Sequence, residues 1–242
     1  MRILNLGCGV KVSSHPDIVN VDWSVYLKLK RNGLTRRLAR IALNGGRLAR
    51  FNSLPDNILV HDLSKGIPAE DESVDGVYHS HLFEHLDRDV ADRFLKEIQR
   101  VLKPNGIVRI VVPDLEYACR NVLEHIHRCE TEEREQPRHD EYVAEIIEQC
   151  VRREASGTSK QKPFRRKVEN ALLGDARRRG ETHQWMYDKV NLSYKLKRAG
   201  FSSTQVCSCH ESQIPGWDSY GLDVTESGAE YKPGSLYMEA RK

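Results

Sequence analysis

Residues 3–9 read ILNLGCG, a short apolar run that ends in two glycines separated by a cysteine. An apolar run of this length bounded by glycine predicts a buried β-strand that enters a tight turn. Glycine after a strand also lets a ligand approach the backbone closely, because no side chain stands in the way. This stretch therefore predicts both the first strand of a sheet and the start of a ligand site.

Strands and helices alternate downstream of this opening. Residues 87–102 have apolar side chains at helical spacing and stop at Lys103-Pro104-Asn105-Gly106, and the strand-like segments are 17–22, 57–63, 73–81 and 106–114. This alternation predicts a parallel, doubly wound α/β sheet. Only eight residues separate Gly9 from Ile18, which leaves room for one helical turn at most in the first crossover.

Two insertions interrupt the alternation. Residues 24–50 hold eight basic side chains and no acidic one, and their apolar spacing predicts one basic amphipathic helix over 26–43, ended by Asn44-Gly45-Gly46. Residues 115–182 are predicted to form a helical cap, with helix over 116–155, a loop over 156–163 and a basic segment over 164–180. Beyond the cap we expect a helix that ends at Gly200, followed by strands over 203–211 and 235–242.

The composition is that of a globular protein of one large domain with insertions, at 242 residues and 39% hydrophobic. No apolar run approaches the roughly 20 residues that span a bilayer, which excludes an integral membrane protein. The first residues lack the apolar stretch of a signal peptide, so a cytoplasmic location is expected. The six cysteines are then expected to be free thiols.

Glycines and polar residues follow the carboxyl ends of the predicted strands, where an open parallel sheet binds its ligands. Asp22 is placed to accept hydrogen bonds from a ribose diol, and Asp62 can meet the amino edge of an adenine. Val12 replaces the third glycine of a dinucleotide fingerprint, and no Lys-Ser/Thr pair follows as in a phosphate-binding loop. The predicted ligand is a nucleoside without a pyrophosphate.

These motifs together resemble class I S-adenosylmethionine-dependent methyltransferases. The resemblance rests on ILNLGCG, the acid in NVDWS, VHDLS, VDGVYHSHLFEHL, RVLKPNGIVRIVVPD, HQWMYD, KRAGF and IPGWDSYGLD…KPGSLYMEA. It is strongest to the branch with an NLGCG opening, whose genes often accompany surface-polysaccharide synthesis. It implies a Rossmann-like, mostly parallel seven-stranded sheet with an antiparallel last strand, in a single domain over residues 1–242 with a helical insertion.

The resemblance implies S-adenosylmethionine as the cofactor and a set of residues that bind it. Gly7 and Gly9 would face its methionine part, Asp22 the ribose and Asp62 with its neighbour the adenine. The acid usual at position 5 is an amide here, which can hydrogen-bond but gives no charge to the cofactor's ammonium, and a loop glycine is replaced by Lys11. The implied set is Asn5, Gly7, Cys8, Gly9, Asp22, Asp62, Leu63 and Ser80.

Methyl transfer from a sulfonium is a direct displacement, so the enzyme must align the reactants and exclude water. A hydroxyl acceptor also benefits from a general base. The candidates at strand ends and at the return of the cap are His81, His85, Asp114 and His183. For the histidines, a structural role in packing is the alternative, and Glu84 is interpreted first as a first-turn helix acid.

No metal site is expected. His79, His81 and His85 lack a matching set of carboxylates, and Cys207, Cys209 and His210 lack a second cysteine pair at finger spacing.

The acceptor is predicted to be a small molecule or glycan, with O-methylation of a sugar or glycan intermediate. A nucleic-acid methyltransferase that uses the basic helix as its electrostatic footprint is one alternative, although no aromatic platform for RNA is present. A non-catalytic cofactor-binding or partner protein is the other, suggested by Asn5, Lys11 and the short first crossover. The basic helix can also make weak contact with an anionic surface or serve as a lid.

Overall fold

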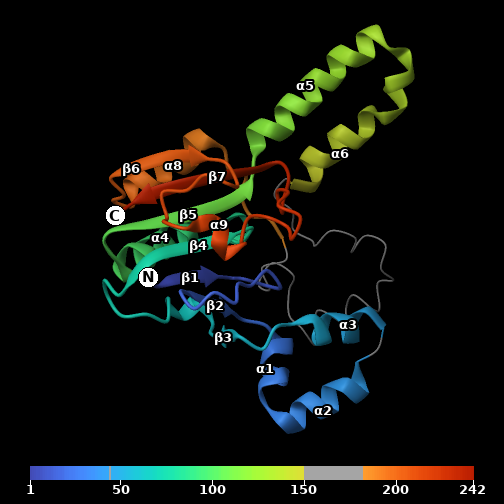
Figure 1. Ribbon diagram of the computed structural model, residues 1–242. Coiled ribbons are helices and arrows are strands. Elements are labelled where there is room, and N and C mark those ends of the chain that lie inside the picture. The colour runs from blue at the N-terminus through green and yellow to red at the C-terminus, as the bar shows by residue number, and fades with distance from the viewer. Residues whose placement is uncertain (44, 150–181) are drawn as a thin grey trace.

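The computed structural model describes residues 1–43, 45–149 and 182–242. Seven strands form one sheet in the order β3-β2-β1-β4-β5-β7-β6 (Figure 1). The strands are β1 (Ile3–Leu6), β2 (Ile18–Asp22), β3 (Ile58–Val60), β4 (Val74–Ser80), β5 (Leu102–Pro113), β6 (Ser203–Cys207) and β7 (Ser235–Arg241). Strands β1 to β5 pair in parallel, and β7 runs antiparallel to both of its neighbours. The predicted mostly parallel seven-stranded sheet is confirmed.

Helices cover both faces of the sheet. One hydrophobic cluster packs α4 and α8 against it, and a second packs α9 with its loop against the other face. Strand β1 is therefore buried at every position and reads as a continuous apolar run. The helices are α1 (Val25–Arg31), α2 (Gly33–Ala42), α3 (Gly45–Ser53), α4 (Arg88–Val101), α5 (Leu115–Thr131), α6 (His139–Gln149), α8 (Lys189–Arg198) and α9 (Trp217–Tyr220), with 3-10 turns η1 (Leu63–Lys65), η2 (Phe83–His85) and η3 (Glu133–Arg138).

The basic segment departs most from the sequence prediction, because it forms three helices instead of one. Asn32 has an extended backbone (φ −104°, ψ 128°), which ends α1, and its side chain accepts a hydrogen bond from the Leu34 N–H at 2.9 Å. Asparagine is a favoured N-cap, so the chain restarts as α2 at once. The Gly45-Gly46 pair, predicted to end the helix, begins α3.

Helix α2 keeps its apolar stripe in solvent. The side chains of Leu34, Leu38 and Ile41 follow the predicted helical spacing but are 68%, 57% and 83% exposed. The apolar periodicity thus predicted a helix here correctly. Among the described residues, however, these three side chains do not form a buried face of that helix.

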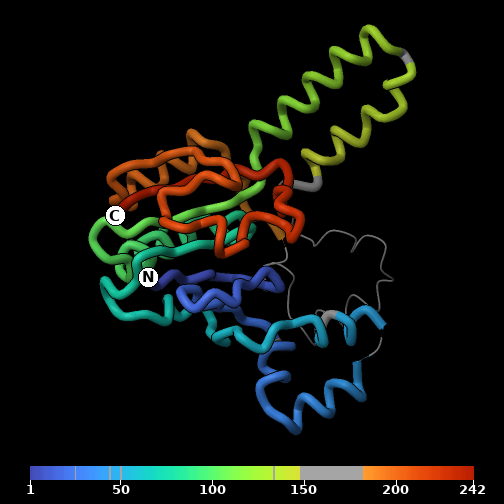
Figure 2. Tube along the Cα trace, viewed as in Figure 1, coloured from blue at the N-terminus to red at the C-terminus, as the bar shows by residue number. Residues whose placement is uncertain are grey.

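The second insertion forms an antiparallel helical hairpin of α5 and α6 instead of one long helix (Figure 2). The turn between them is η3, which contains Pro137, and proline cannot continue a helix through its interior. The loop predicted at 156–163 and the basic segment at 164–180 lie outside the described residues.

Both insertions begin at the carboxyl edge of the sheet. Helix α1 follows β2 and α5 follows β5, and the two insertions diverge from that edge (Figures 1 and 2). The first crossover, residues 7–17, contains turns and no helix, so the single helical turn allowed by its length does not form. The third and sixth strands are shorter than predicted. No helix in the described part of the chain is long and apolar enough to cross a membrane.

Candidate active site

A pocket of about 270 Å³ lies where the strand order reverses, between β1 and β4. This switch point is where open α/β sheets bind their ligands. The pocket collects six of the predicted site residues from two strand ends, while its opposite wall comes from the C-terminal segment. Its lining residues are Asn5, Gly7, Cys8, Gly9, Val10, Lys11, Tyr78, Ser80, His81, Tyr231 and Lys232.

The glycine loop leaves open space on its pocket side. Gly7 and Gly9 have φ angles of +64° and +54°, a region that favours glycine. A side chain at Gly7 would come within 3.1 Å of Leu82, and one at Gly9 would enter open space. The Asp22 carboxylate accepts hydrogen bonds from the N–H groups of Gly9 and Trp23. The carboxylate is half-exposed at the end of β2. It fixes the glycine loop, and its remaining lone pairs can accept hydrogen bonds from hydroxyl groups such as those of a ribose.

The structure explains why position 5 carries an amide instead of an acid. Its Nδ2 donates to the Lys11 carbonyl and to Asn20 Oδ1, both at 3.0 Å, and Asn20 in turn donates to the Ser13 carbonyl at 2.8 Å. An ionised carboxylate has no N–H to donate and could not make these bonds. Asn5 therefore braces the first crossover, which has no helix to hold it.

Lys11 joins the glycine loop to the C-terminal wall of the pocket. Its Nζ donates to the Val224 carbonyl at 2.6 Å and lies 4.4 Å from the centre of the Tyr231 ring. Burial lowers the pKa of this lysine. The same segment contributes Lys232, whose pKa burial also lowers. Sequence reasoning missed this wall, because its residues lie more than 200 positions from the loop they meet.

Asp62 and Leu63 lie at the end of β3, outside the lining of this pocket. Asp62 Oδ1 accepts hydrogen bonds from the Ser64 N–H at 3.0 Å and the Ser64 hydroxyl at 2.7 Å, which caps η1 and lowers the Asp62 pKa. Strand β3 adjoins β2 in parallel, so both residues lie one strand beyond Asp22. Their contact with an adenine stays a prediction.

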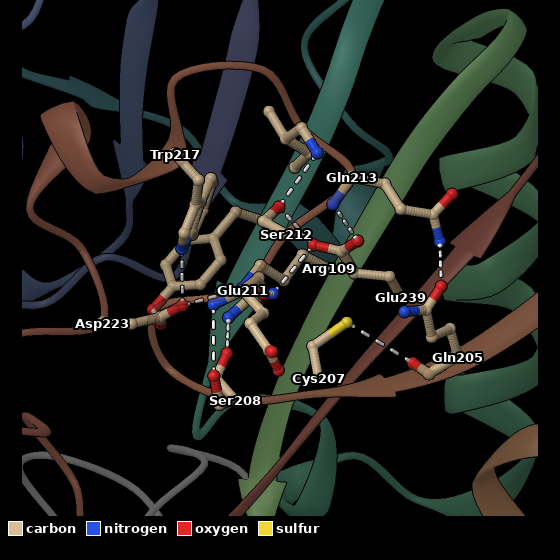
Figure 3. Close-up of polar contacts among 12 residues, drawn as sticks. Arg109, Gln205, Cys207, Ser208, Glu211, Ser212, Gln213, Trp217, Asp223 and Glu239 are labelled. Carbon is tan, nitrogen blue, oxygen red and sulfur yellow. Dashed lines mark hydrogen bonds and ion pairs between the residues drawn. The ribbon is translucent and has the colours of Figure 1, made fainter.

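A buried ionic cluster anchors the segment that supplies the far wall (Figure 3). The Arg109 guanidinium of β5 binds Asp223 Oδ2 at 2.7 Å and Glu239 Oε1 at 2.8 Å, and all three side chains are 2% exposed or less. Asp223 also accepts from Tyr78 Oη at 2.7 Å and Trp217 Nε1 at 2.8 Å. Arg109 further donates to the carbonyls of Ser208 and Glu211. The cluster fixes the loop that carries Tyr231 and Lys232 against the sheet.

A second buried cluster surrounds the Glu84 carboxyl, which the sequence indicated first as a first-turn helix acid and only second as a site residue. Glu84 is 1% exposed, and neither carboxyl oxygen has a hydrogen-bond partner among the described residues. Its Oε1 lies 3.4 Å from His81 Nδ1 and 3.8 Å from His85 Nε2. The His183 ring meets the His85 ring edge to face, with centres 4.7 Å apart. Three of the four predicted catalytic residues therefore gather around this one acid.

The hydrogen bonds around the histidines indicate the protonation of this acid. The Ser235 hydroxyl donates to the Lys232 carbonyl at 2.7 Å, so His81 Nε2 must donate to Ser235 Oγ at 2.9 Å. His85 Nδ1 likewise faces the Thr182 carbonyl, at 3.3 Å. In each neutral ring the remaining nitrogen is an acceptor and faces Glu84. A protonated carboxyl has one O–H that can be directed at one of these acceptors, whereas a carboxylate has none.

Burial shifts each pKa value in this cluster in the direction that favours the neutral form of the group. It raises the pKa of Glu84 to about 8 and lowers those of His81 and His85 to about 3 and about 4. Desolvation disfavours the charged form of each group, so near neutral pH the cluster is mostly uncharged. Of these three groups, Glu84 has the pKa that lies closest to neutral pH.

The fourth predicted catalytic residue, Asp114, lies at the start of α5. Its Oδ1 accepts from the Glu116 N–H at 3.0 Å as an N-cap, while burial raises its pKa. It adjoins Tyr187 through a backbone bridge, and a catalytic role for it stays a prediction. His79 is fully buried between Phe83 and Phe94, which is a core position.

The fold is that of an α/β protein with a pocket at the carboxyl edge of its sheet, at the switch point between β1 and β4. Residues 4–110 match the family model of the methyltransferase domain, and this span includes the glycine loop, Asp22, Asp62 and Glu84. This part of the chain, a little under half of it, thus matches a methyltransferase domain, and S-adenosylmethionine is the cofactor that the resemblance implies for it.

No curated protein matches the chain, whereas many solved structures do. A candidate O-methyltransferase from Nostoc punctiforme is 13% identical, with a TM-score of 0.44; the match covers 100% of this chain but 51% of that one, so this chain spans about half its length. An S-adenosylmethionine-dependent methyltransferase from Archaeoglobus fulgidus is 12% identical (100% and 86% covered, TM-score 0.42). The 1,6-didemethyltoxoflavin N1-methyltransferase of Burkholderia thailandensis is 14% identical (99% and 70% covered, TM-score 0.43). Neighbours this distant assign no acceptor to the chain.

Proposed function

We propose that the protein transfers the methyl group to a hydroxyl oxygen of a sugar or glycan intermediate. The observation that carries this proposal is the position of Glu84, 3.4 Å from His81, which itself lines the cofactor pocket. A hydroxyl acceptor must lose its proton as its oxygen takes the methyl group, and a base with a pKa near the working pH suits that task. Glu84, with a pKa raised to about 8 by burial, is such a base.

S-adenosylmethionine supplies a methyl group on a positively charged sulfur, so the protein's part is to hold, align and deprotonate. In this proposal Gly7 and Gly9 admit the methionine part, and Lys232 pairs with its carboxylate. Asp22 accepts hydrogen bonds from the ribose hydroxyls, and Asp62 with its neighbour Leu63 receives the adenine. Glu84 takes up the acceptor's proton in its carboxylate form, whose population rises as the pH approaches its pKa of about 8.

A sugar acceptor is supported by the resemblance to the polysaccharide-associated branch. Next to the proposed base, the backbone N–H groups of Gln184 and Trp185 both donate to the Glu84 carbonyl, at 2.7 and 3.3 Å. The Trp185 ring packs on the hydrophobic core, with the Arg88 guanidinium 4.4 Å from its centre. The insertions at 24–50 and 115–182 would then border the acceptor within a single domain.

The test is a transfer assay with methyl-labelled S-adenosylmethionine and separate pools of nucleotide sugars, glycans and RNA. We expect label on the sugar or glycan pool as an ether that survives alkali, and loss of that label in Asp22→Ala, which removes the acceptor for the ribose. Calorimetry should show cofactor binding weakened at least about tenfold in that variant, or about 1.4 kcal/mol. Label on nitrogen or on RNA, or cofactor binding without transfer to any pool, would contradict the proposal.

A nucleic-acid acceptor is the second candidate, favoured by the exposed basic residues of α1 to α3. Arg36, Arg37 and Arg40 extend from α2 beside its exposed apolar stripe. RNA binding through this surface would weaken steeply with salt. If the RNA pool takes label only at low salt, and Arg36→Ala with Arg37→Ala abolishes it, this second candidate replaces the first.

A further inference from the structure

Three potential metal ligands meet near the tip of the helical hairpin, away from the cofactor pocket. His125 and Cys129 lie one turn apart on α5, and His139 begins α6 after the turn at η3. His125 Nδ1 lies 3.1 Å from His139 Nδ1 and 3.4 Å from Cys129 Sγ. The three donor atoms all lie within 4.8 Å of one another.

These distances fit the edges of a tetrahedron around a zinc ion. Bonds of about 2.05 Å to nitrogen and about 2.3 Å to sulfur give edges of about 3.3 Å between two nitrogens and about 3.6 Å between nitrogen and sulfur. The observed separations of 3.1 and 3.4 Å agree within a few tenths of an ångström. Imidazole with thiolate is also the donor set that zinc prefers over magnesium or calcium.

The surroundings of His125 supply a second, independent observation. This side chain is fully buried, yet its Nε2 has no hydrogen-bond partner among the described residues. Glu135 Oε2 lies 3.7 Å from that Nε2. A histidine that binds metal through one ring nitrogen usually directs its other N–H to a carboxylate, which fixes the tautomer and the ring. Glu135 occupies that position.

Few apolar side chains of the hairpin are fully buried in the part of it that the structure describes. Of the described side chains of α5, only Ala118 and His125 are buried, while Leu123, Ile126 and Ile147 are exposed. His125 stacks instead on His139 and Tyr142, with ring centres 5.3 and 4.0 Å apart. Two short helices without a core are marginal in water, and a bound metal stabilises such a unit directly.

We propose that His125, Cys129 and His139 bind one Zn²⁺ ion, which closes the α5–α6 hairpin, with solvent at the fourth position. Binding releases the thiol proton of Cys129 to solvent, because the thiolate is the ligand. The ion stabilises the hairpin and takes no part in methyl transfer. The site is independent of the proposed acceptor, so it stands if the acceptor assignment fails.

The test is a Co²⁺ titration of the full chain after removal of metal by a chelator, since Co²⁺ reports tetrahedral and thiolate ligation in its absorbance. We expect one equivalent to bind with a thiolate-to-cobalt charge-transfer band, and Zn²⁺ to displace it. Cys129→Ala should abolish the band, and His139→Ala should weaken binding by on the order of a hundredfold or more. Matched controls on the same helix are Cys119→Ala and His127→Ala, which should bind as the wild type does.

Glu135→Gln tests the supporting carboxylate with little risk to folding. This substitution should weaken Co²⁺ binding by about tenfold to a hundredfold and leave the thiolate-to-cobalt charge-transfer band in place. Cofactor binding measured on every variant shows that the sheet remains folded. Absence of Co²⁺ binding, binding without a thiolate band, or affinity unchanged in Cys129→Ala would overturn the proposal; in the last two cases the metal lies elsewhere, for instance at Glu84, His85 and His183.

Discussion

Two clusters bury carboxyl groups equally deeply in this protein, but only one of them provides partners. Asp223 and Glu239 are 3% and 0% exposed and both bind the Arg109 guanidinium, while Glu84 is 1% exposed and has no hydrogen-bond partner among the described residues. A buried polar group without a partner costs free energy, so a protein retains it where the group has a task. The paired cluster holds the pocket wall, and the unpaired acid can exchange a proton beside the pocket.

The largest effect is expected from Arg109→Leu. Removing the cation leaves two buried carboxylates without their partner, which costs about 3–5 kcal/mol of unfolding free energy. Urea denaturation followed by circular dichroism measures the loss. The matched control is Arg120→Leu, whose guanidinium pairs with Glu116 on the surface and should show no measurable change. Equal stability of the two variants would mean that the buried cluster is not structural.

Replacing an acid by its amide should lower the stability of the protein by different amounts in the two clusters. In Asp223→Asn the new NH2 group replaces one of two accepting oxygens, either Oδ2, which accepts from Arg109 and Trp217, or Oδ1, which accepts from Tyr78. The donor that loses its acceptor costs about 1–3 kcal/mol. In Glu84→Gln a neutral amide replaces a mostly neutral acid, so stability near pH 7 should change by less than that. The comparison fails if Glu84→Gln is the more destabilising variant by urea denaturation.

Glu84 should also leave a signature in the pH dependence of stability. Its folded pKa, about 8, lies above the ordinary value of 4.5. Its contribution is therefore complete below pH 4.5 and is lost as pH rises to 8, by on the order of 1 kcal/mol per pH unit. The buried histidines act in the opposite direction, but only below about pH 6.5. Between pH 6.5 and 8 the wild type should lose stability relative to Glu84→Gln, and parallel curves would rule out this titration.

The smallest effect is expected from Lys232→Met. Lys232 lowers the pKa of Glu84 by electrostatic attraction, although burial dominates. Without that charge the transition of Glu84 should move upward by less than about one pH unit. Lys197→Met, on the exposed side of α8, is the control and should leave the transition in place. A downward shift would contradict the assigned geometry.

The sheet could be predicted from sequence because its signals are local. Apolar runs such as residues 3–6 each indicate one element, and alternation fixes the class. Lys103-Pro104-Asn105-Gly106 correctly marked the end of α4, but the structure places these residues at the start of β5, so the predicted turn before that strand was wrong. Asn32 carried a usable signal that the prediction missed, since asparagine before glycine both ends a helix and caps the next. Gly45-Gly46 led to a wrong prediction, because these residues, expected to end a helix, begin α3 instead.

The site was only half predictable, because its chemistry depends on distant partners. The glycine loop and Asp22 follow from their places at strand ends. Arg109 is a lone charge in an apolar strand, a signal for a buried ion pair that the prediction missed, and its acids lie 114 and 130 positions away. Nothing in the sequence separates Glu84 from an ordinary first-turn acid, because its burial arises only when residues 182–185 pack on it.

Infrared difference spectroscopy of the wild type against Glu84→Gln, recorded from pH 5 to pH 9, tests the central claim most directly. A protonated carboxyl absorbs at a carbonyl frequency distinct from that of a carboxylate or an amide. We predict that the wild type has a protonated-carboxyl band at pH 7 that Glu84→Gln lacks, and that this band disappears with a midpoint near pH 8. No such band between pH 5 and pH 7 would mean that Glu84 is ionised throughout this range, which would contradict the raised pKa that burial gives it.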